Sequence, residues 1–164
     1  MSYQTQVSRV LDDEHRANLE LLARVEHAFS RPPAAGDGVD SQLAQLAGAF
    51  GRYLAQDIGR HFEFEEQQLF PRMRDAGDGD MATLLVEEHD AIREVARELA
   101  PLTQAAAAGT LDAAGWRALR SGALEMVERQ VAHIQKETMA LLPLLDDLLD
   151  EDDDRELAFA YASG

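Results

Sequence analysis

The sequence predicts an all-α fold, an antiparallel up-down-up-down four-helix bundle followed by a short C-terminal helical extension. Three observations lead to this prediction. Alanine, leucine and glutamate are abundant and only 6% of the residues are aromatic, a composition that favours helices. Apolar residues recur at steps of three and four along four long segments, and breakers separate these segments. With 164 residues, the chain is long enough to bury one core without staples.

The first two helices are predicted on either side of a breaker rich in proline and glycine. The first helix is expected over about residues 4–30, and its apolar face consists of Val7, Leu11, Leu19, Leu22, Val25 and Phe29. Residues 31–38, which read RPPAAGDG, form the breaker. The second helix is expected over about residues 41–73, with Pro71 near its end and an apolar face that includes Phe50, Leu54, Ile58 and Leu69.

The third helix is expected over about residues 80–107, after a loop at residues 75–79. Pro101 should kink or shorten it, because proline has no amide proton and its ring clashes with the preceding turn. Gly109 and Thr110 end it, and Asp112 is a suitable N-cap for the fourth helix. That helix should extend to about Leu149 with a bend near Pro143. The bundle therefore occupies residues 1–149.

Residues 150–164 are predicted to form an acidic tail and a short amphipathic extension. The acidic run at residues 150–154 lacks the ordered spacing and the glycine of a calcium-binding loop, so we expect it to be solvated. Leu157, Phe159 and Tyr161 follow this run. Two roles fit these three residues: they cap one end of the bundle, or they form contacts in a homodimer.

Charge and composition exclude several classes of function. The chain has 15 Lys and Arg against 31 Asp and Glu, a net charge of −16, so we expect no nucleic-acid partner and no membrane partner. It has no cysteine, which excludes disulfides, thiolate metal sites and cysteine nucleophiles. Residues 1–10 show no signal-peptide pattern, and no apolar run reaches the roughly 20 residues of a membrane span. We therefore expect a cytoplasmic protein.

The two halves of the chain repeat a pattern of histidine and glutamate. The segment DEHRANL, which contains His15, resembles EEHDAIR, which contains His89, 74 positions later. In the same way, His61 and Glu65 match His133 and Glu137, 72 positions later, and a proline follows six residues after each glutamate. Such a repeat suggests two helical hairpins related by a pseudo-two-fold axis.

Six polar residues of this repeat continue the apolar faces of the helices, so they should point into the bundle. They are His15, His61, Glu65, His89, His133 and Glu137. In each His-x-x-x-Glu pair both side chains lie on one face, about 6 Å apart along the axis. Counting residues from the loops places the pairs Glu65 with His89 and His89 with His133 at matching depths. His15 and His61 differ by about 8 Å at 1.5 Å per residue, a slack that the proline-rich loop can absorb, so we expect all six to meet.

A cation is the natural compensation for two carboxylates and four imidazoles in a helical core. Nitrogen and carboxylate ligands suit iron, manganese or zinc, whereas calcium prefers oxygen alone. Each half of the repeat supplies two histidines. Two bridging carboxylates would then give each of two metal ions two nitrogen and two oxygen ligands, with positions left for an oxo or hydroxo bridge and an exogenous ligand. A hydrogen-bonded polar core without metal is the alternative.

Several polar residues near the proposed ligands are expected outside the site. His27 lies about 120° around the helix from His15 and should be on the surface. Glu14, Glu66 and Glu88 each adjoin a proposed ligand in the sequence. Because they should face another direction, we expect them on the solvated face.

Other side chains are expected in the core near the site. Gln130, one turn before His133, is either a hydrogen-bond partner of a metal ligand or a tolerated polar core residue. Four aromatic residues should pack in the core, where they also fit the wall of a ligand pocket: Phe50, Tyr53, Phe62 and Phe64.

The six residues and their placement on four helices resemble the hemerythrin-like, cation-binding HHE domains, over roughly residues 7–149. The family usually holds a non-haem di-iron centre. The resemblance implies that the six residues are the metal ligands and that Glu65 and Glu137 bridge two iron ions. Oxygen-carrying hemerythrins have a fifth histidine one turn from the ligand on the third helix. In this chain, the positions one turn on either side of His89 hold Leu85 and Arg93.

Three functions fit this interpretation. The first is a binding or sensing module whose di-iron site takes oxygen, nitric oxide or peroxide, or which handles iron itself. The second is a di-iron oxidase or peroxidase. The third is a structural or partner-binding bundle that a metal such as zinc stabilises. We favour the first, because the six ligands leave room for an exogenous ligand. For the second, no additional general acid or nucleophile near the site can be named from the sequence.

Overall fold

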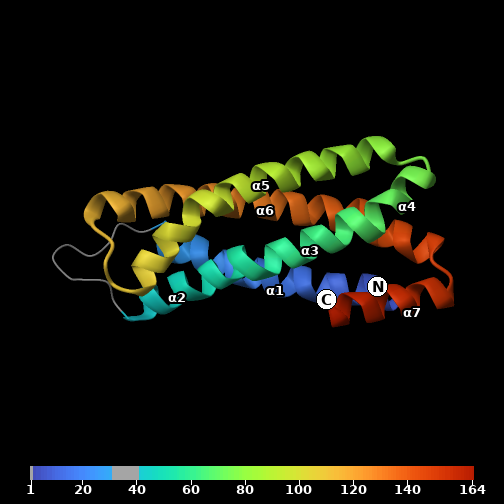
Figure 1. Ribbon diagram of the computed structural model, residues 1–164, viewed down its shortest axis with the longest axis horizontal. Helices are drawn as coiled ribbons and strands as arrows, with labels where there is room; N and C mark the ends of the chain where they lie inside the picture. The colour runs from blue at the N-terminus through green and yellow to red at the C-terminus, as the bar shows by residue number, and fades with distance from the viewer. Residues whose placement is uncertain (1, 31–40) are drawn as a thin grey trace.

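The computed structural model describes residues 2–30 and 41–164, which form helices joined by short turns and contain no strand. Four helical arms make the bundle: α1 (Gln6–Phe29), the arm from α2 to α4 (residues 41–75), α5 (Gly79–Ala107) and α6 (Ala113–Leu148). A further helix, α7 (Glu151–Ser163), folds back beside α1 (Figure 1). The predicted all-α bundle with a C-terminal helical extension is thereby confirmed. The predicted breaker at residues 31–38 lies outside the described residues.

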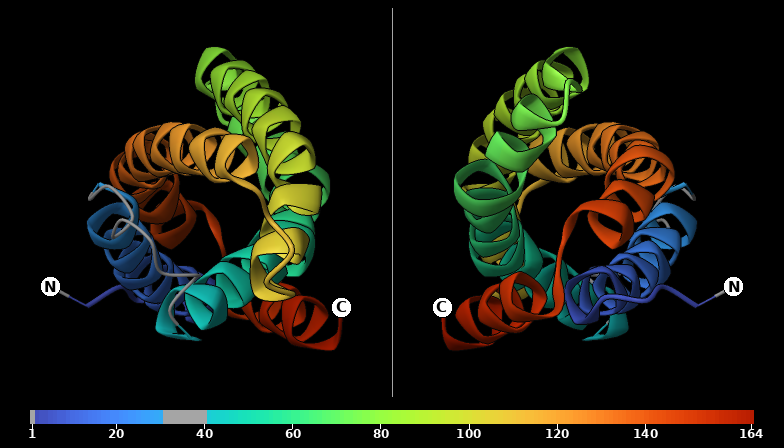
Figure 2. Two further views of the ribbon diagram at one scale, coloured as in Figure 1. Left: turned by 90° about the vertical axis from the view of Figure 1, so that its left-hand side faces the viewer. Right: turned by 90° about the vertical axis from the view of Figure 1, so that its right-hand side faces the viewer.

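Neighbouring arms form a closed ring. α1 packs against α6 and α2, α6 against α5, and α5 against α2 and α4, and the end-on views show the helices around a common centre (Figure 2). None of the helices in the described residues is both long and apolar enough to cross a membrane.

Side-chain caps and glycines set the ends of the helices. Thr5, Asp112 and Asp150 each accept the amide N–H three residues later, so α1, α6 and α7 begin there. The predicted cap at Asp112 is therefore confirmed. Gly77 and Gly109 adopt positive φ angles of 94° and 73° after α4 and α5, a conformation that glycine tolerates best.

The second arm differs from the regular helix that we predicted. Two π-helical segments, η1 (Tyr53–Asp57) and η2 (Glu65–Leu69), interrupt it between α2 (Ser41–Arg52), α3 (Ile58–Phe64) and α4 (Phe70–Asp75). Pro71 accounts for the second interruption, because it has no amide proton and its ring crowds the preceding turn. Segments of this kind occur frequently at functional sites, and η2 begins at a predicted ligand, Glu65.

The two prolines inside later helices leave those helices unbroken. Pro101 lies within α5, which continues to Ala107, and Figure 1 shows α5 bending toward α2 in its last turns. Of the two predicted effects of Pro101, the helix therefore shows the bend and not the shortening. Pro143 lies within α6, which continues to Leu148.

Buried apolar residues form two clusters along the bundle, and each arm crosses both. On α1, Leu11 belongs to one cluster and Leu22 to the other; on α6, Leu141 and Met126 divide in the same way. The histidine and glutamate positions fall at or next to the boundary between the two clusters on every arm. The predicted core aromatics are all buried: Phe50, Tyr53, Phe62 and Phe64.

Helix α7 is part of the packed core, so the expectation of a fully solvated acidic run is wrong. Leu157 and Tyr161 are buried in the same cluster as Val7, which confirms the capping role for these two residues, whereas Phe159 is 74% exposed. Asp154 is only 8% exposed, and its carboxylate accepts the backbone N–H groups of Gln6 and Val7 at 2.9 and 3.0 Å. The first turn of α1 has orphan N–H groups, and a carboxylate there is favoured by the helix dipole.

Replacing Asp154 with alanine is expected to destabilise the protein by about 1–3 kcal/mol, because it leaves two amide groups without their charged acceptor. Chemical denaturation measures this change. Asp152→Ala is the matched control, since that side chain is 87% exposed, and it should change stability by less than about 0.5 kcal/mol. Equal effects of the two substitutions would contradict the anchoring role of Asp154.

Candidate metal centre

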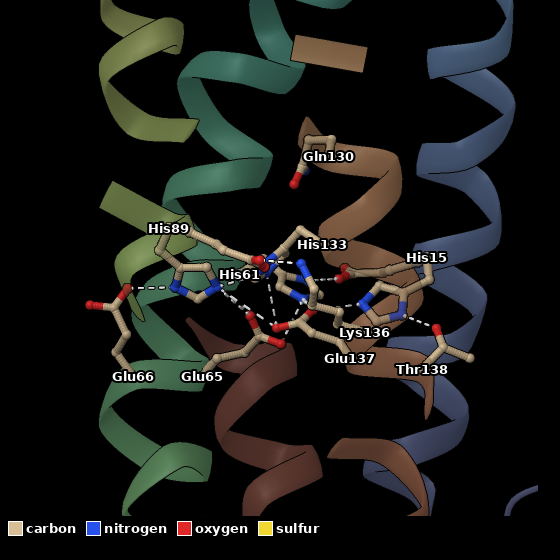
Figure 3. A network of polar contacts seen from close by, with 12 residues as sticks. His15, His61, Glu65, Glu66, His89, Gln130, His133, Lys136, Glu137 and Thr138 are labelled. Atoms are coloured by element: carbon tan, nitrogen blue, oxygen red, sulfur yellow. Dashed lines mark hydrogen bonds and ion pairs between the residues drawn. The ribbon is translucent and has the colours of Figure 1, made fainter. Parts of the chain in front are cut away.

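The structure brings all six predicted site residues together in one buried layer. His15 comes from α1, His61 from α3, Glu65 from the start of η2, His89 from α5, and the last two, His133 and Glu137, from α6. All six are at most 6% exposed. Figure 3 shows their imidazoles and carboxylates pointing toward one another between the helices.

Glu137 lies between two pairs of histidines. Its Oε1 is 3.1 Å from His15 Nε2 and 3.8 Å from His61 Nε2. Its Oε2 is 3.2 Å from His133 Nε2 and 3.7 Å from His89 Nε2. One carboxylate oxygen therefore faces each pair.

Glu65 is placed in the same manner. Its Oε2 is 3.2 Å from His61 Nε2 and its Oε1 is 3.2 Å from His89 Nε2. Two groups of four ligand atoms result, each with its atoms within 4.8 Å of one another. One group contains His15 and His61, the other contains His89 and His133, and both contain the two glutamates.

The outward nitrogens of the histidines are held by a second set of side chains. The Nδ1 atoms of His61, His89 and His133 lie 2.9, 2.7 and 2.9 Å from the carboxylates of Glu14, Glu66 and Glu88, respectively. The Nδ1 of His15 lies 3.2 Å from the hydroxyl of Thr138. Proton donation from Nδ1 to a carboxylate leaves the Nε2 lone pair free to point inward, which is the usual arrangement around a metal.

The expectation that these three glutamates face away from the site is therefore wrong. Each adjoins an inward ligand on its own helix, about 100° around the axis. This places it at the edge of the bundle interior, from where it reaches a histidine of another arm. Two of the carboxylates also bind cations, since Glu66 pairs with Arg93 at 2.6 Å and Glu88 pairs with Lys136. The sequence feature that could have revealed these three glutamates is the position of each one directly next to an inward-facing ligand.

Tyr161 on α7 is a contact of the site that the sequence did not reveal. Its hydroxyl donates to Glu14 and lies 3.3 Å from His61 Nδ1. The carbonyl of Tyr161 accepts from Arg60, whose guanidinium also lies over the tyrosine ring. The C-terminal helix thus helps to fix the orientation of His61.

The two buried carboxylates favour positive charge on the groups around them. Burial opposes the charged form of His61, but the nearby carboxylates of Glu65, Glu137 and Glu14 raise its pKa well above the ordinary value. Burial is likewise outweighed at His89, where Glu137 and Glu65 raise the pKa to about 9. Burial also opposes ionisation of Glu137, yet His133 and neighbouring hydrogen bonds hold its pKa well below the ordinary value.

The donor set fits metal ions better than it fits a hydrogen-bonded core. The Nε2 atoms of His89 and His133 lie 3.0 Å apart, although both bond outward through Nδ1. Both oxygens of Glu65 and the Oε2 of Glu137 are buried without a hydrogen-bond partner among the described residues. Converging lone pairs of this kind call for a shared cation. Two nitrogens and two carboxylates per group suit iron, manganese or zinc.

The remaining predicted neighbours are also placed. Phe62 stacks on His89 with ring centroids 3.7 Å apart, and Phe70 lies 5.3 Å from the same ring. Gln130 is buried and its amide donates to the Tyr53 hydroxyl, so it contacts no proposed ligand through a described hydrogen bond. His27 is exposed, as predicted.

Comparison with known proteins agrees with this geometry. The profile of the Hemerythrin HHE cation binding domain matches residues 6–145. The chain belongs to this family. The hemerythrin match contains all six buried histidines and glutamates, so the chain is a hemerythrin HHE domain with a cluster that could hold metal.

Curated relatives of this hemerythrin domain include two Yersinia proteins. They are the iron-sulfur cluster repair protein YtfE of Yersinia pseudotuberculosis serotype IB (strain PB1/+) and that of Yersinia pestis (strain Pestoides F). Each is 28% identical over 139 residues, which cover 80% of this chain and 59% of the relative. The chain thus spans about three-fifths of the length of these relatives.

Glu88→Gln is expected to weaken metal binding about 10- to 100-fold, because the carboxylate orients the His133 ring and makes its Nε2 a better ligand. The substitution keeps the shape of the side chain and removes its charge. Glu87→Gln, an exposed position next to it, is the matched control. Competition with a metal chelator measures both affinities, and a similar loss in the two variants would contradict this role for Glu88.

Proposed function

We propose that this protein is a non-haem di-iron protein that binds or senses oxygen, nitric oxide or peroxide. One observation supports this most strongly: each of Glu65 and Glu137 turns one oxygen to each pair of histidines. In this proposal, His15 and His61 hold one iron ion and His89 and His133 hold the other. The two carboxylates would bridge the ions, together with an oxo or hydroxo group. Manganese or zinc could occupy the same ligands.

The iron ions would supply redox chemistry and open coordination positions, and the chain supplies the surroundings. Glu14, Glu66 and Glu88 accept the Nδ1 protons and so fix the tautomer of three histidines. Phe62 covers one face of the His89 ring and keeps water away from it. These features favour a protected site with room for a small ligand.

Metal content and the absorption spectrum test the proposal. The protein is purified after growth with iron, and bound metals are counted per chain by elemental analysis. About two irons per chain, with charge-transfer bands that change reversibly when oxygen is added to the reduced protein, would support it. Absence of bound metal even after reconstitution with ferrous iron would contradict it. That result would favour a polar core in which the histidines and glutamates bond only to one another.

Two other functions have separate signatures. Sustained consumption of hydrogen peroxide, rather than one oxidation per site, would indicate a di-iron peroxidase. The repair of iron–sulfur clusters, named for the Yersinia relatives, would require reactivation of a damaged iron–sulfur enzyme by the iron-loaded protein. We place repair second, because the matched region covers 59% of those relatives.

A further inference from the structure

Helix α7 lies along the seam between α1 and the second arm. It packs mainly against α1, and both end-on views place it on the side of the bundle away from α5, which carries His89 (Figure 2). In its first turn, Asp153 lies 3.6 Å from Arg72 of α4. Near its end, the ring of Tyr161 lies 4.6 Å from the ring of Phe64 on α3. The helix therefore closes this side of the bundle.

Tyr161 covers the outer edge of one ligand group, the first group, which contains His15 and His61. Its ring stands perpendicular to the His61 ring, with centroids 6.2 Å apart. Its hydroxyl donates to Glu14 and lies 3.3 Å from His61 Nδ1. The Glu14 side chain is already 36% exposed. Movement of α7 away from α1 would uncover this edge of His61 and release the Glu14 carboxylate from Tyr161.

Few buried side chains hold α7 in place. Of its 13 residues, three are buried, namely Asp154, Leu157 and Tyr161. The first accepts the amide N–H groups at the start of α1, and the other two join an apolar cluster to which all four arms contribute. A terminal helix with so few buried contacts opens locally at a lower free-energy cost than the whole bundle. α7 can therefore undock while the four arms stay folded.

The two ligand groups also differ in the partners of their outward nitrogens. In the second group, His89 and His133 each face a carboxylate, and each of these carboxylates pairs with a cation. In the first group only His61 faces a carboxylate, because the Nδ1 of His15 lies against the hydroxyl of Thr138. Such outer partners change metal affinity about 10- to 100-fold. The first group should therefore hold its ion less tightly.

We propose that α7 is a movable cover over the first ligand group. Its undocking sets the rate at which the ion held by His15 and His61 enters and leaves, while the ion held by His89 and His133 stays bound. The two observations agree, because the weaker ligand group is the one that the terminal helix covers. This inference rests on the proposed metal function and adds a means of regulating it, since a contact that holds or frees α7 would control exchange at one ion alone.

Release of zinc to a chromophoric chelator tests the cover. Zinc accepts the same ligands as iron and undergoes no redox change. The protein loaded with two zinc ions should release them in two phases of equal amplitude, with rates that differ about tenfold or more. Leu157→Ala removes a buried contact of α7 and leaves the ligands intact. It should accelerate the fast phase about tenfold or more and the slow phase less than about twofold.

Leu119→Ala is the matched control, because Leu119 is a fully buried leucine of α6 in the other apolar cluster. It should weaken the bundle without freeing α7, so both release rates should change less than about twofold. Tyr161→Phe keeps the ring and removes the bond to Glu14. It should also accelerate the fast phase about tenfold, the effect of losing a hydrogen bond to a charged group, and it replaces Leu157→Ala should that variant fold poorly.

The outcomes separate this inference from the proposed function. A protein that binds neither iron nor zinc contradicts both. With two zinc ions bound, the cover alone is overturned if both ions leave in one phase, or if Leu157→Ala accelerates both phases equally. The same conclusion follows if Leu119→Ala accelerates release as much as Leu157→Ala does, because release then requires unfolding of the whole bundle.

Hydrogen exchange of the metal-free protein gives a readout that does not depend on loading. The backbone amides of residues 157–163 should exchange about 100-fold faster than those of residues 11–25 in α1, because α7 opens without the bundle. Leu157→Ala should increase the exchange of α7 further and leave that of α1 unchanged. Equal exchange of α7 and α1 in the wild-type protein would show that α7 opens only with the bundle and would overturn the proposal.

Discussion

The double variant His61→Ala/His133→Ala should lose its bound metal almost completely and keep its helices. His61 and His133 belong to different groups of ligand atoms, which share only the two glutamates. Removing both histidines leaves each group with a single imidazole, too few nitrogen ligands for tight binding of iron or zinc. Elemental analysis measures the metal, and circular dichroism in the far ultraviolet measures the helices.

The helices should persist because the apolar clusters on both sides of the site remain. His27→Ala is the control, because this exposed histidine contacts no site residue in the described structure. His61→Ala alone should reduce binding to about one ion per chain. Full metal content in the double variant would refute the ligand assignment.

The sequence predicted the six central residues because they interrupt otherwise apolar helical faces. A histidine in the series Leu11, His15, Leu19 must point inward if the helix is regular. The repeat of the same pattern in the second half made a chance arrangement a poor explanation. Backbone periodicity therefore placed both the bundle and the layer in which these residues meet.

The parts of the site that the sequence did not predict depend on contacts between arms. Glu14 lies beside His15 in the chain, but it bonds to His61 on another arm. Helical periodicity assigns such a residue to the edge of the core, and only the packing of the arms decides whether it faces water or a neighbour. The position of Tyr161 was harder still to predict, because the Tyr161 hydroxyl reaches Glu14 only when α7 folds back along α1.

The π-helical segments were missed for a related reason. The predicted second arm assumed one uniform helix, in which Leu54, Ile58, His61 and Glu65 share a face. Each π turn adds a residue and rotates the helix after it. In the structure, η1 and η2 lie on either side of α3, so the helix that carries His61 is offset from the helices before and after it. Such offsets arise from packing and from Pro71, which a periodicity count does not weigh.

Removing the metal is expected to lower the melting temperature by about 10 °C or more. A ligand that binds only the folded state, present at about 1,000 times its Kd, stabilises that state by about 4 kcal/mol per site. For a chain of this length, 1 kcal/mol corresponds to about 2–4 °C. Calorimetry of the iron-loaded and chelator-treated protein measures the difference. The double histidine variant should not respond to chelator, because it has no metal to lose.

The same experiment separates a redox site from a structural one. Zinc should restore most of the lost stability, because it accepts the same nitrogen and carboxylate ligands. Only the iron-loaded protein should change its spectrum when oxygen is added. If iron and zinc stabilise equally and the iron form ignores oxygen, nitric oxide and peroxide, the metal has a structural role. If neither metal raises the melting temperature, the buried imidazoles and carboxylates compensate one another, and the cluster is not a metal site.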